Sequence, residues 1–463
     1  MKAELVRVAL SVASAGLPLA AGLGIVQLVP LLRRESFPVR CGWGWILGTA
    51  WAGATTAFVS IALGLALKRG TVLPLFLLPV AAGLLHRIVT GSGSPRKLGA
   101  GRLSLLAVAV GACVTVSILA EAVTNPVRDW DGRMTWAPLA RWMRAERTVK
   151  PAVLTESWWW VTHPKYPPLL PALDVAVAEA ANLSWDGRAT RPLRTLFYPA
   201  VLLVLFGASR RMAGGRAAAA AVLLFASAPF PAFSNHGGAA GEYADLPLAA
   251  FYGGGLLLLV LGRRSAAAGA AAGLLLAAAA LTKNEGLPLV LVALAGAPLL
   301  LPALGERRKS AFAASSAVVL GGAVLLWAYK HGIPNRFDED YFSSMGARLS
   351  VAKMRANLGA ALPVVARKTF DVRSWVLLPF LVPALLLAAG RRLTAYPAWL
   401  LLGAASLLPC ALGLAAYAVG FNVADLASVT WERFLLQGSL PLFALLALAI
   451  RRLLTARGSA RRA

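Results

Sequence analysis

The sequence predicts an all-α polytopic membrane protein, and three observations support this fold class. Hydrophobic residues make up 58% of the 463 positions, and only 14% are charged, against about 25% in an ordinary soluble domain. The mean hydropathy is +0.68. Apolar runs close to the roughly 20 residues that a membrane-spanning helix needs recur from one end of the chain to the other. Because a helix satisfies its own backbone hydrogen bonds in lipid, we expect the spans to be helical.

About thirteen spans are expected from the lengths of these apolar runs. In chain order they cover residues 8–32, 45–66, 72–88, 102–122, 195–209, 217–234, 245–262, 266–282, 286–304, 311–329, 374–390, 396–419 and 432–450. The run 8–32 is too long for the apolar part of a cleaved signal peptide, so we expect it to be retained. We interpret residues 1–101 as additional N-terminal helices and residues 102–463 as the main membrane domain.

The basic residues predict the orientation. The chain has 46 basic and 20 acidic residues, a net charge of +26. Basic residues such as Arg210–Arg211 and Arg451–Arg452 follow the spans on one side, which the positive-inside rule assigns to the cytoplasm together with the C-terminus. No basic stretch is interleaved with base-stacking aromatic residues, which argues against nucleic acid as a partner. The three cysteines lie far apart, so neither a disulfide framework nor a zinc site is indicated.

This orientation concentrates the carboxylates on the outer face. All of the acidic residues except Glu4, Glu35 and Glu306 fall in outer loops or at outer helix ends. The two long outer loops are 123–194 and 330–373, and the apolar stretch 168–182 in the first predicts an interfacial or re-entrant helix. The positive-inside rule makes little demand on acidic residues. The concentration of carboxylates therefore requires a separate explanation.

The strongest candidate site is the segment R-D-W-D-G-R at 128–133, directly outside the span 102–122. Asp129 and Asp131 are flanked by arginines, which favour ionised carboxylates and can also bind a phosphate. This combination suits a general base beside an anionic substrate. A solvated turn with local ion pairs is the alternative interpretation.

The other end of the same loop carries H-P-K-Y-P-P at 163–168. The prolines predict an extended entry into the interfacial helix. His163, Lys165 and Tyr166 are candidate substrate-binding residues, because histidine and lysine can bind a phosphate or a sugar hydroxyl. A proline-rich turn at the lipid surface is the alternative interpretation.

Charged residues also stand at the mouths of later spans. Glu242 and Asp245 follow a glycine-rich outer turn, and Lys283 and Glu285 occupy a very short one. Arg433 lies at the expected outer start of the last span. Charges so close to hydrocarbon are costly unless they face a cavity or a partner, so we take them as candidate substrate-binding residues. Snorkelling also explains Lys283, and an ion pair at a helix end also explains Arg433.

Together, these motifs resemble those of the GT-C integral-membrane glycosyltransferases, which include the protein O-mannosyltransferases and the aminoarabinose transferases acting on lipid A. The similarity is closer to bacterial members with a W-D-G first loop, here at 130–132 and followed by H-P-K-Y-P-P-L at 163–169. It also covers L-T-K-N-E-G at 281–286 and E-R-F-L-L-Q at 432–437. The resemblance extends over roughly residues 102–450. Three expected spans precede the family's usual first helix, which is a departure from the pattern.

The resemblance implies an activity. In that family a polyprenyl-phosphate-linked sugar enters from the bilayer, and an acceptor is glycosylated on the outer face with a first-loop acid as the base. Carried over by motif, that acid is Asp131, with Asp129 beside it. Glu242 and Asp245 match the acids near the second outer loop. Some relatives use a divalent metal (Mg²⁺ or Mn²⁺), which two neighbouring aspartates permit without requiring it.

Transfer from such a donor needs positive charge for the departing phosphate, and Arg433, Lys283 and Lys165 are the candidates to hold it. A transporter or flippase of lipid-linked sugars is the rival class, although the middles of the expected spans are almost free of charge. A membrane scaffold is a third class, which predicts no cluster of carboxylates on one face. The composition, rich in Ala, Arg and Gly, is typical of a bacterium with a GC-rich genome and places the protein in the plasma membrane, within the cell envelope. The sugar and the acceptor are not defined by the sequence.

Overall fold

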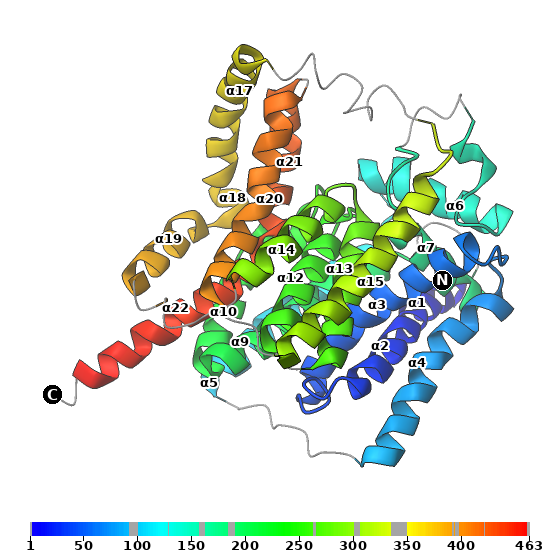
Figure 1. The fold of residues 1–463 in the computed structure, drawn as a ribbon, viewed down its shortest axis with the longest axis horizontal. Coiled ribbons are helices and arrows are strands. Elements are labelled where there is room, and N and C mark those ends of the chain that lie inside the picture. The colour runs from blue at the N-terminus through cyan, green and yellow to red at the C-terminus, as the bar shows by residue number, and fades with distance from the viewer. Residues whose placement is uncertain are drawn as a thin grey trace.

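The computed structural model of the chain describes residues 2–91, 101–127, 129–156, 163–183, 190–262, 265–300, 306–334, 350–390, 393, 398–420 and 422–460. Within these ranges every regular element is a helix (Figure 1), which confirms the all-α prediction. Arg128 of the first candidate motif lies outside the described residues.

The N-terminal part of the chain forms five helices. They are α1 (Lys2–Ser14), α2 (Gly16–Leu28), α3 (Phe37–Ile61), α4 (Arg69–Thr90) and α5 (Arg102–Thr124). A single turn residue, Ala15, separates α1 from α2, and Ala9–Leu28 is still long and apolar enough to cross a membrane as one span, within the expected 8–32. Helix α2 packs against both α3 and α4, where Gly22 lies so close to Gly44 that a Cβ would lie 1.7 Å from its carbonyl oxygen. Glycine at this position allows the two backbones to approach.

The middle of the chain alternates short and long helices. They are the π-helix η1 (Gly132–Trp136), α6 (Ala137–Glu146), the 3₁₀ turn η2 (Ala152–Leu154), α7 (Leu169–Ala180), α8 (Arg191–Thr195), α9 (Phe197–Ala213), α10 (Gly215–Ala226), α11 (Pro229–Phe233), α12 (Asp245–Leu261), α13 (Ala266–Thr282), α14 (Gly286–Leu300) and α15 (Glu306–Lys330). A helix, α7, occupies the stretch 168–182. Nearly every residue of α7 is buried, because it packs between α3, α4 and α6 inside the protein.

The C-terminal part contains α17 (Val351–Thr369), α18 (Val372–Trp375), α19 (Leu378–Ala389), α20 (Trp399–Val419), α21 (Val423–Gln437) and α22 (Ser439–Ala460). The last expected span, 432–450, is interrupted by a bend of 50° between α21 and α22. Gly438 lies at this bend, and a Cβ there would be 2.2 Å from the carbonyl oxygen of Ser406. Arg433 therefore lies in the last turns of α21, before the bend, and not at the start of a continuous span.

The lengths and compositions of the helices support a membrane-embedded protein. Six helices of the described residues are long and apolar enough to cross a membrane, or seven if α21 and α22 count as one bent span, and five shorter helices are also apolar. Even if all five shorter helices also cross, the described residues supply at most twelve spans, one fewer than the expected thirteen. Helix α4 shows large apolar side chains to the outside, with Leu85 63% and Ile88 80% exposed, as expected of a lipid-facing helix.

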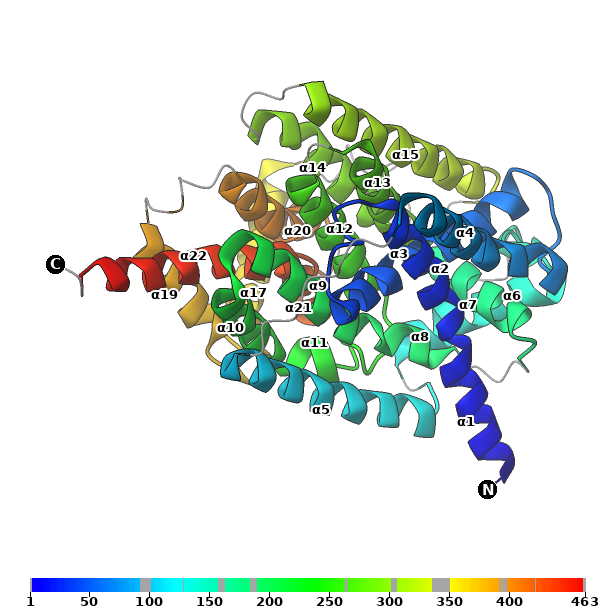
Figure 2. The same cartoon turned by 90° about the horizontal axis from the view of Figure 1, so that it is seen from below.

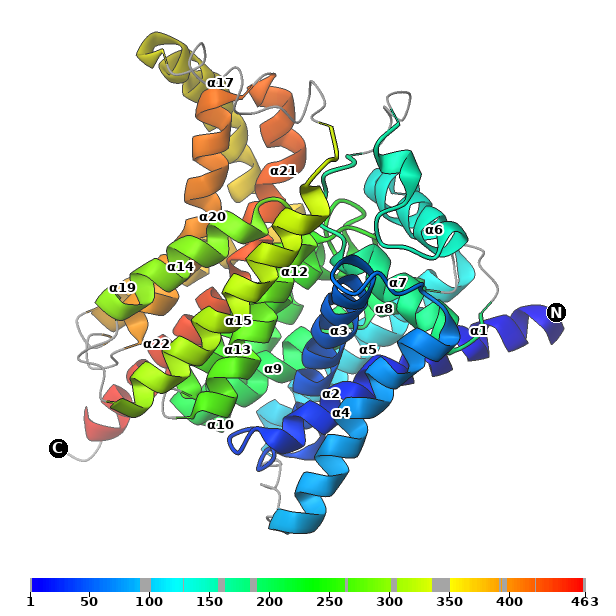
Figure 3. The same ribbon diagram turned by 45° about the vertical axis from the view of Figure 1, so that its right-hand side comes forward.

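One hydrophobic core joins the N-terminal helices to the rest of the bundle. It includes residues from Ala15 to Ala449, so it draws on both sides of residue 101. Glu35, which is 1% exposed, pairs with Arg210 at 3.0 Å and also with Arg211, both in α9. Helices α5 and α15 lie along opposite sides of the bundle (Figure 2). Helices α6 and α17 lie at one end and α10 at the other (Figure 3).

Candidate functional site

A buried cluster of charged side chains lies where α12 begins. Asp245, the first residue of α12, is fully buried. Its Oδ1 accepts hydrogen bonds from Lys283 Nζ at 2.9 Å and Gln437 Nε2 at 2.8 Å. Its Oδ2 accepts one from Arg433 Nε at 2.8 Å. The cluster therefore joins the start of α12, the turn between α13 and α14, and the end of α21 around one compensated carboxylate.

Arg433 connects this cluster to the first outer loop. Its Nη2 donates to Asp131 Oδ2 at 3.1 Å, while its Nε bonds Asp245. The guanidinium also lies 4.6 Å from the ring centroid of Tyr243, a cation–π contact. Arg433 thus donates hydrogen bonds to two carboxylates, Asp131 and Asp245, that are far apart in the sequence.

Asp131 is more accessible than Asp245, with 14% of its side chain exposed against 0%. Among the described residues, its Oδ1 accepts no hydrogen bond. Burial raises the pKa of Asp131 above its usual value, and the positive charges of Arg433 and Lys283 oppose this rise. A carboxylate with a raised pKa and a free oxygen suits a general base.

Asp129 has a different environment, although the sequence groups it with Asp131. It is 7% exposed. Its Oδ1 accepts the backbone N–H of Gly132 at 2.8 Å, and its Oδ2 accepts the backbone N–H of Glu242 at 3.0 Å. Both oxygens are therefore occupied in holding two backbone segments together. This geometry fits a positioning residue for Asp131 better than a second base.

The glycine of the W-D-G motif is required by this packing. A Cβ on Gly132 would lie 2.7 Å from Asp129 Oδ1 and 2.8 Å from Glu242 Cβ. We expect Gly132→Ala to lower the free energy of unfolding by about 1–3 kcal/mol, the usual cost of overpacking. Thermal unfolding in detergent measures this loss. The matched control is Gly359→Ala, where nothing lies within 4 Å of the added Cβ; equal stability of both variants would contradict the steric argument.

Arg191 ties the end of α5 to the loop that precedes α12. It is 3% exposed. Its Nη1 donates to the carbonyl oxygen of Asn125 at 2.6 Å, and its Nη2 to that of Ala240 at 3.0 Å. Its Nε lies 3.5 Å from Glu242 Oε1. The two segments that carry the candidate acids are therefore fixed to each other by one buried guanidinium.

Glu242 is expected to make stability depend on pH. Burial raises the pKa of its carboxyl to about 8, against the opposing charge of Arg194. The folded protein then keeps a proton that the unfolded chain loses above its usual 4.5, so this stabilisation is complete below pH 4.5 and is lost as the pH rises through 8. We expect the melting temperature of the wild type to fall over this range more than that of Glu242→Gln, which cannot ionise. Parallel curves for the two proteins in the same detergent would contradict this prediction.

The H-P-K-Y segment lies beside the same site. The ring of Tyr166 stacks on Trp136, with centroids 5.4 Å apart, and on His163, with centroids 4.6 Å apart. The charge of His163 lowers the pKa of Asp131. Lys165 is half-buried in the same turn. The structure thus brings His163 and Tyr166 to the Asp131 end of the cluster.

Lys283 and Glu285 extend the cluster on its other side. Lys283 Nζ lies 3.1 Å from Glu285 Oε1 and is 3% exposed as a side chain, whereas Glu285 is 31% exposed. Lys283 and Arg433 are both paired with carboxylates in this state. An anionic substrate would therefore compete with those carboxylates for the two cations.

Sequence reasoning missed several members of this region. Gln437 lies one helical turn after Arg433, so the i, i+4 spacing in E-R-F-L-L-Q was the available signal. Arg194 forms a buried bidentate pair with Asp174, at 2.9 and 2.6 Å, which fixes α8 to α7. For Arg191 and this pair the sequence offers no signal, because their partners are remote in the chain.

The donor set does not fit a divalent metal shared by the two aspartates. Both oxygens of Asp129 accept backbone N–H groups, and Asp131 Oδ2 accepts from Arg433. In the described parts of the chain, no group of three or more His, Cys, Asp or Glu side chains is arranged to hold a metal ion. We derive no step through a metal here.

No protein-family model, curated protein or solved structure matches this chain.

Proposed function

We propose that the protein is a membrane glycosyltransferase of the GT-C type that moves a sugar from a polyprenyl-phosphate donor to an acceptor at the outer face of the plasma membrane. In this proposal the C-terminus is cytoplasmic and Asp131 is the base. The observation that supports it is the placement of Asp131. A half-buried carboxylate, one oxygen of which accepts no hydrogen bond from the described residues, lies 3.1 Å from a guanidinium that also bonds Asp245.

In this reaction the carboxylate takes the proton of the acceptor hydroxyl as that oxygen attacks the anomeric carbon. The bond from that carbon to the phosphate oxygen breaks, and polyprenyl phosphate departs. Arg433 lies beside Asp131, so it can stabilise the negative charge of the departing phosphate.

The experiment reconstitutes the purified protein in liposomes with a panel of radiolabelled polyprenyl-phosphate sugars and membrane extract as the source of acceptor. Release of polyprenyl phosphate or transfer of label by the wild type supports the proposal. Protein-free liposomes and boiled protein provide the background. Absence of turnover for every donor would contradict it.

A transporter of lipid-linked sugars is the second candidate, and the break between α21 and α22 favours it. Transporters often place binding residues at interrupted helices, and here Arg433 and Gln437 precede a bend of 50°. Movement of a fluorescent lipid-linked sugar between leaflets, without cleavage, separates this function from the transferase.

A further inference from the structure

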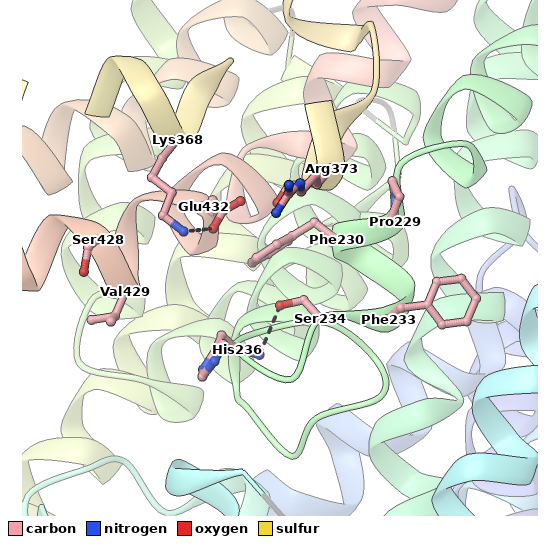
Figure 4. A pocket seen from close by; sticks show the side chains of 11 residues that line it. Pro229, Phe230, Phe233, Ser234, His236, Lys368, Arg373, Ser428, Val429 and Glu432 are labelled. Atoms are coloured by element: carbon pink, nitrogen blue, oxygen red, sulfur yellow. Dashed lines mark hydrogen bonds and ion pairs between the residues drawn. The ribbon is translucent and has the colours of Figure 1, made fainter. Parts of the chain in front are cut away.

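A pocket of about 470 Å³ lies between α11, α17, α18 and α21 (Figure 4), near the Asp131 site. None of Asp131, Asp245 and Lys283 lines it. The segment between α11 and α12 separates the two sites. In that segment His236, which lines the pocket, contacts the edge of Tyr243, and Tyr243 lies under Arg433.

The walls of the pocket combine positive charge with hydroxyl groups. Lys368 from α17 and Arg373 from α18 line it together with His236 and serine side chains. Lys368 Nζ pairs with Glu432 Oε2 at 2.9 Å. Arg373 is exposed, and among the described residues it forms no ion pair. The pocket therefore keeps one uncompensated positive charge, which favours an anionic ligand.

The mouth of the pocket is apolar. Phe233 is 50% exposed and Val429 is 55% exposed, and both line the pocket. Val372, next to Arg373 in the chain, is 56% exposed. Phe230 forms the floor and stacks on Trp375, with ring centroids 5.3 Å apart. An arginine rimmed by exposed apolar side chains matches a ligand that has an anionic head and a hydrocarbon tail.

The geometry points to a binding site for the phosphate head group of a membrane amphiphile, with Arg373 as its principal contact and Phe233 and Val429 against the chain. Arg373 supplies a planar fork of N–H donors that suits phosphate oxygens. Ser234, whose hydroxyl oxygen accepts the backbone N–H of His236 at 3.1 Å, can supply a further donor. This inference does not depend on sugar transfer at Asp131.

The test titrates the detergent-purified protein with dodecyl phosphate, and separately with inorganic phosphate, by microscale thermophoresis. We expect dodecyl phosphate to bind more tightly than inorganic phosphate. Arg373→Ala should raise the Kd for dodecyl phosphate at least about tenfold, because a charged hydrogen bond is lost. The matched control is Arg367→Ala on α17, an exposed arginine that does not line the pocket, and it should leave the Kd unchanged. Phe233→Ser should weaken the binding of dodecyl phosphate and leave the binding of inorganic phosphate unchanged.

Equal Kd values for Arg373→Ala and the wild type would overturn the inference. Equal weakening by Arg367→Ala and Arg373→Ala would also overturn it, because the binding would then be unspecific attraction to a basic surface. Inorganic phosphate binding as tightly as dodecyl phosphate would overturn the lipid assignment. These Kd values are measured without turnover, so a failure of the sugar-transfer proposal is distinguishable from a failure here.

Discussion

Replacing Asp131 with asparagine is expected to lower turnover of the polyprenyl-phosphate sugar about 10²- to 10⁴-fold, the range that a positioned proton transfer contributes. Asparagine keeps the size of the side chain and can still accept a hydrogen bond from Arg433, but it cannot take a proton. Initial rates in liposomes measure the loss. The matched control is Asp425→Asn, an exposed aspartate in the first turn of α21, which should retain full activity.

The pH dependence provides a second readout for the same residue. Asp131 acts as a base only when it is ionised, and burial raises its pKa above the usual 3.8. The rate should therefore rise with pH through an acid limb that lies above that value. Arg433→Gln removes the largest charge that opposes the rise, so its acid limb should lie at higher pH. Full activity of Asp131→Asn, or an acid limb unaffected by Arg433→Gln, would remove Asp131 as the base.

Replacing Asp245 with asparagine is expected to produce the largest loss of stability, about 3–5 kcal/mol, because it breaks a buried ion pair and leaves its partners uncompensated. Three side chains donate hydrogen bonds to this carboxylate, two of them cations, and the residue is fully buried. Thermal unfolding in detergent measures the loss. The exposed Asp425→Asn should change stability by no more than about 0.5 kcal/mol.

A double variant distinguishes a lost ion pair from a general loss of packing. In Asp245→Asn combined with Lys283→Met, one unpaired cation is removed together with the carboxylate. We expect the double variant to be more stable than the sum of the two single losses predicts, because the pair is energetically coupled. Strict additivity would show that charge compensation between Asp245 and Lys283 is not the source of the effect.

The stability of the cluster and the placement of the base depend on the same contacts. Arg433 is held by Asp245 and in turn holds Asp131, so Asp245→Asn should also loosen the position of the base. If the variant folds, its activity loss should exceed that of Asp425→Asn even at temperatures where it is fully folded.

The fold class and much of the element pattern could be predicted from the sequence. Apolar runs of membrane length identified α5, α13 and α20 to within a few residues, because a continuous helix in lipid needs only a long apolar stretch. The helix breaks were not predicted. The run 432–450 bends at Gly438, where a backbone from α20 approaches closely. A break caused by a neighbouring helix leaves no mark in the local hydropathy.

The sequence predicted which residues belong to the candidate site, but it did not predict the role of each residue. The sequence alone determined that Asp131, Asp245, Lys283 and Arg433 are charges at helix mouths, where an unpaired charge is costly. Only the tertiary structure decided that Arg433 joins two of the aspartates, and that Asp129 is occupied by backbone N–H groups while Asp131 keeps an oxygen free. The physical reason is that the local sequence shows which charged side chains need a partner of opposite charge. The partners that compensate them come from other segments, 38 residues away for Lys283 and Asp245 and 302 residues away for Arg433 and Asp131, and only packing brings those segments together.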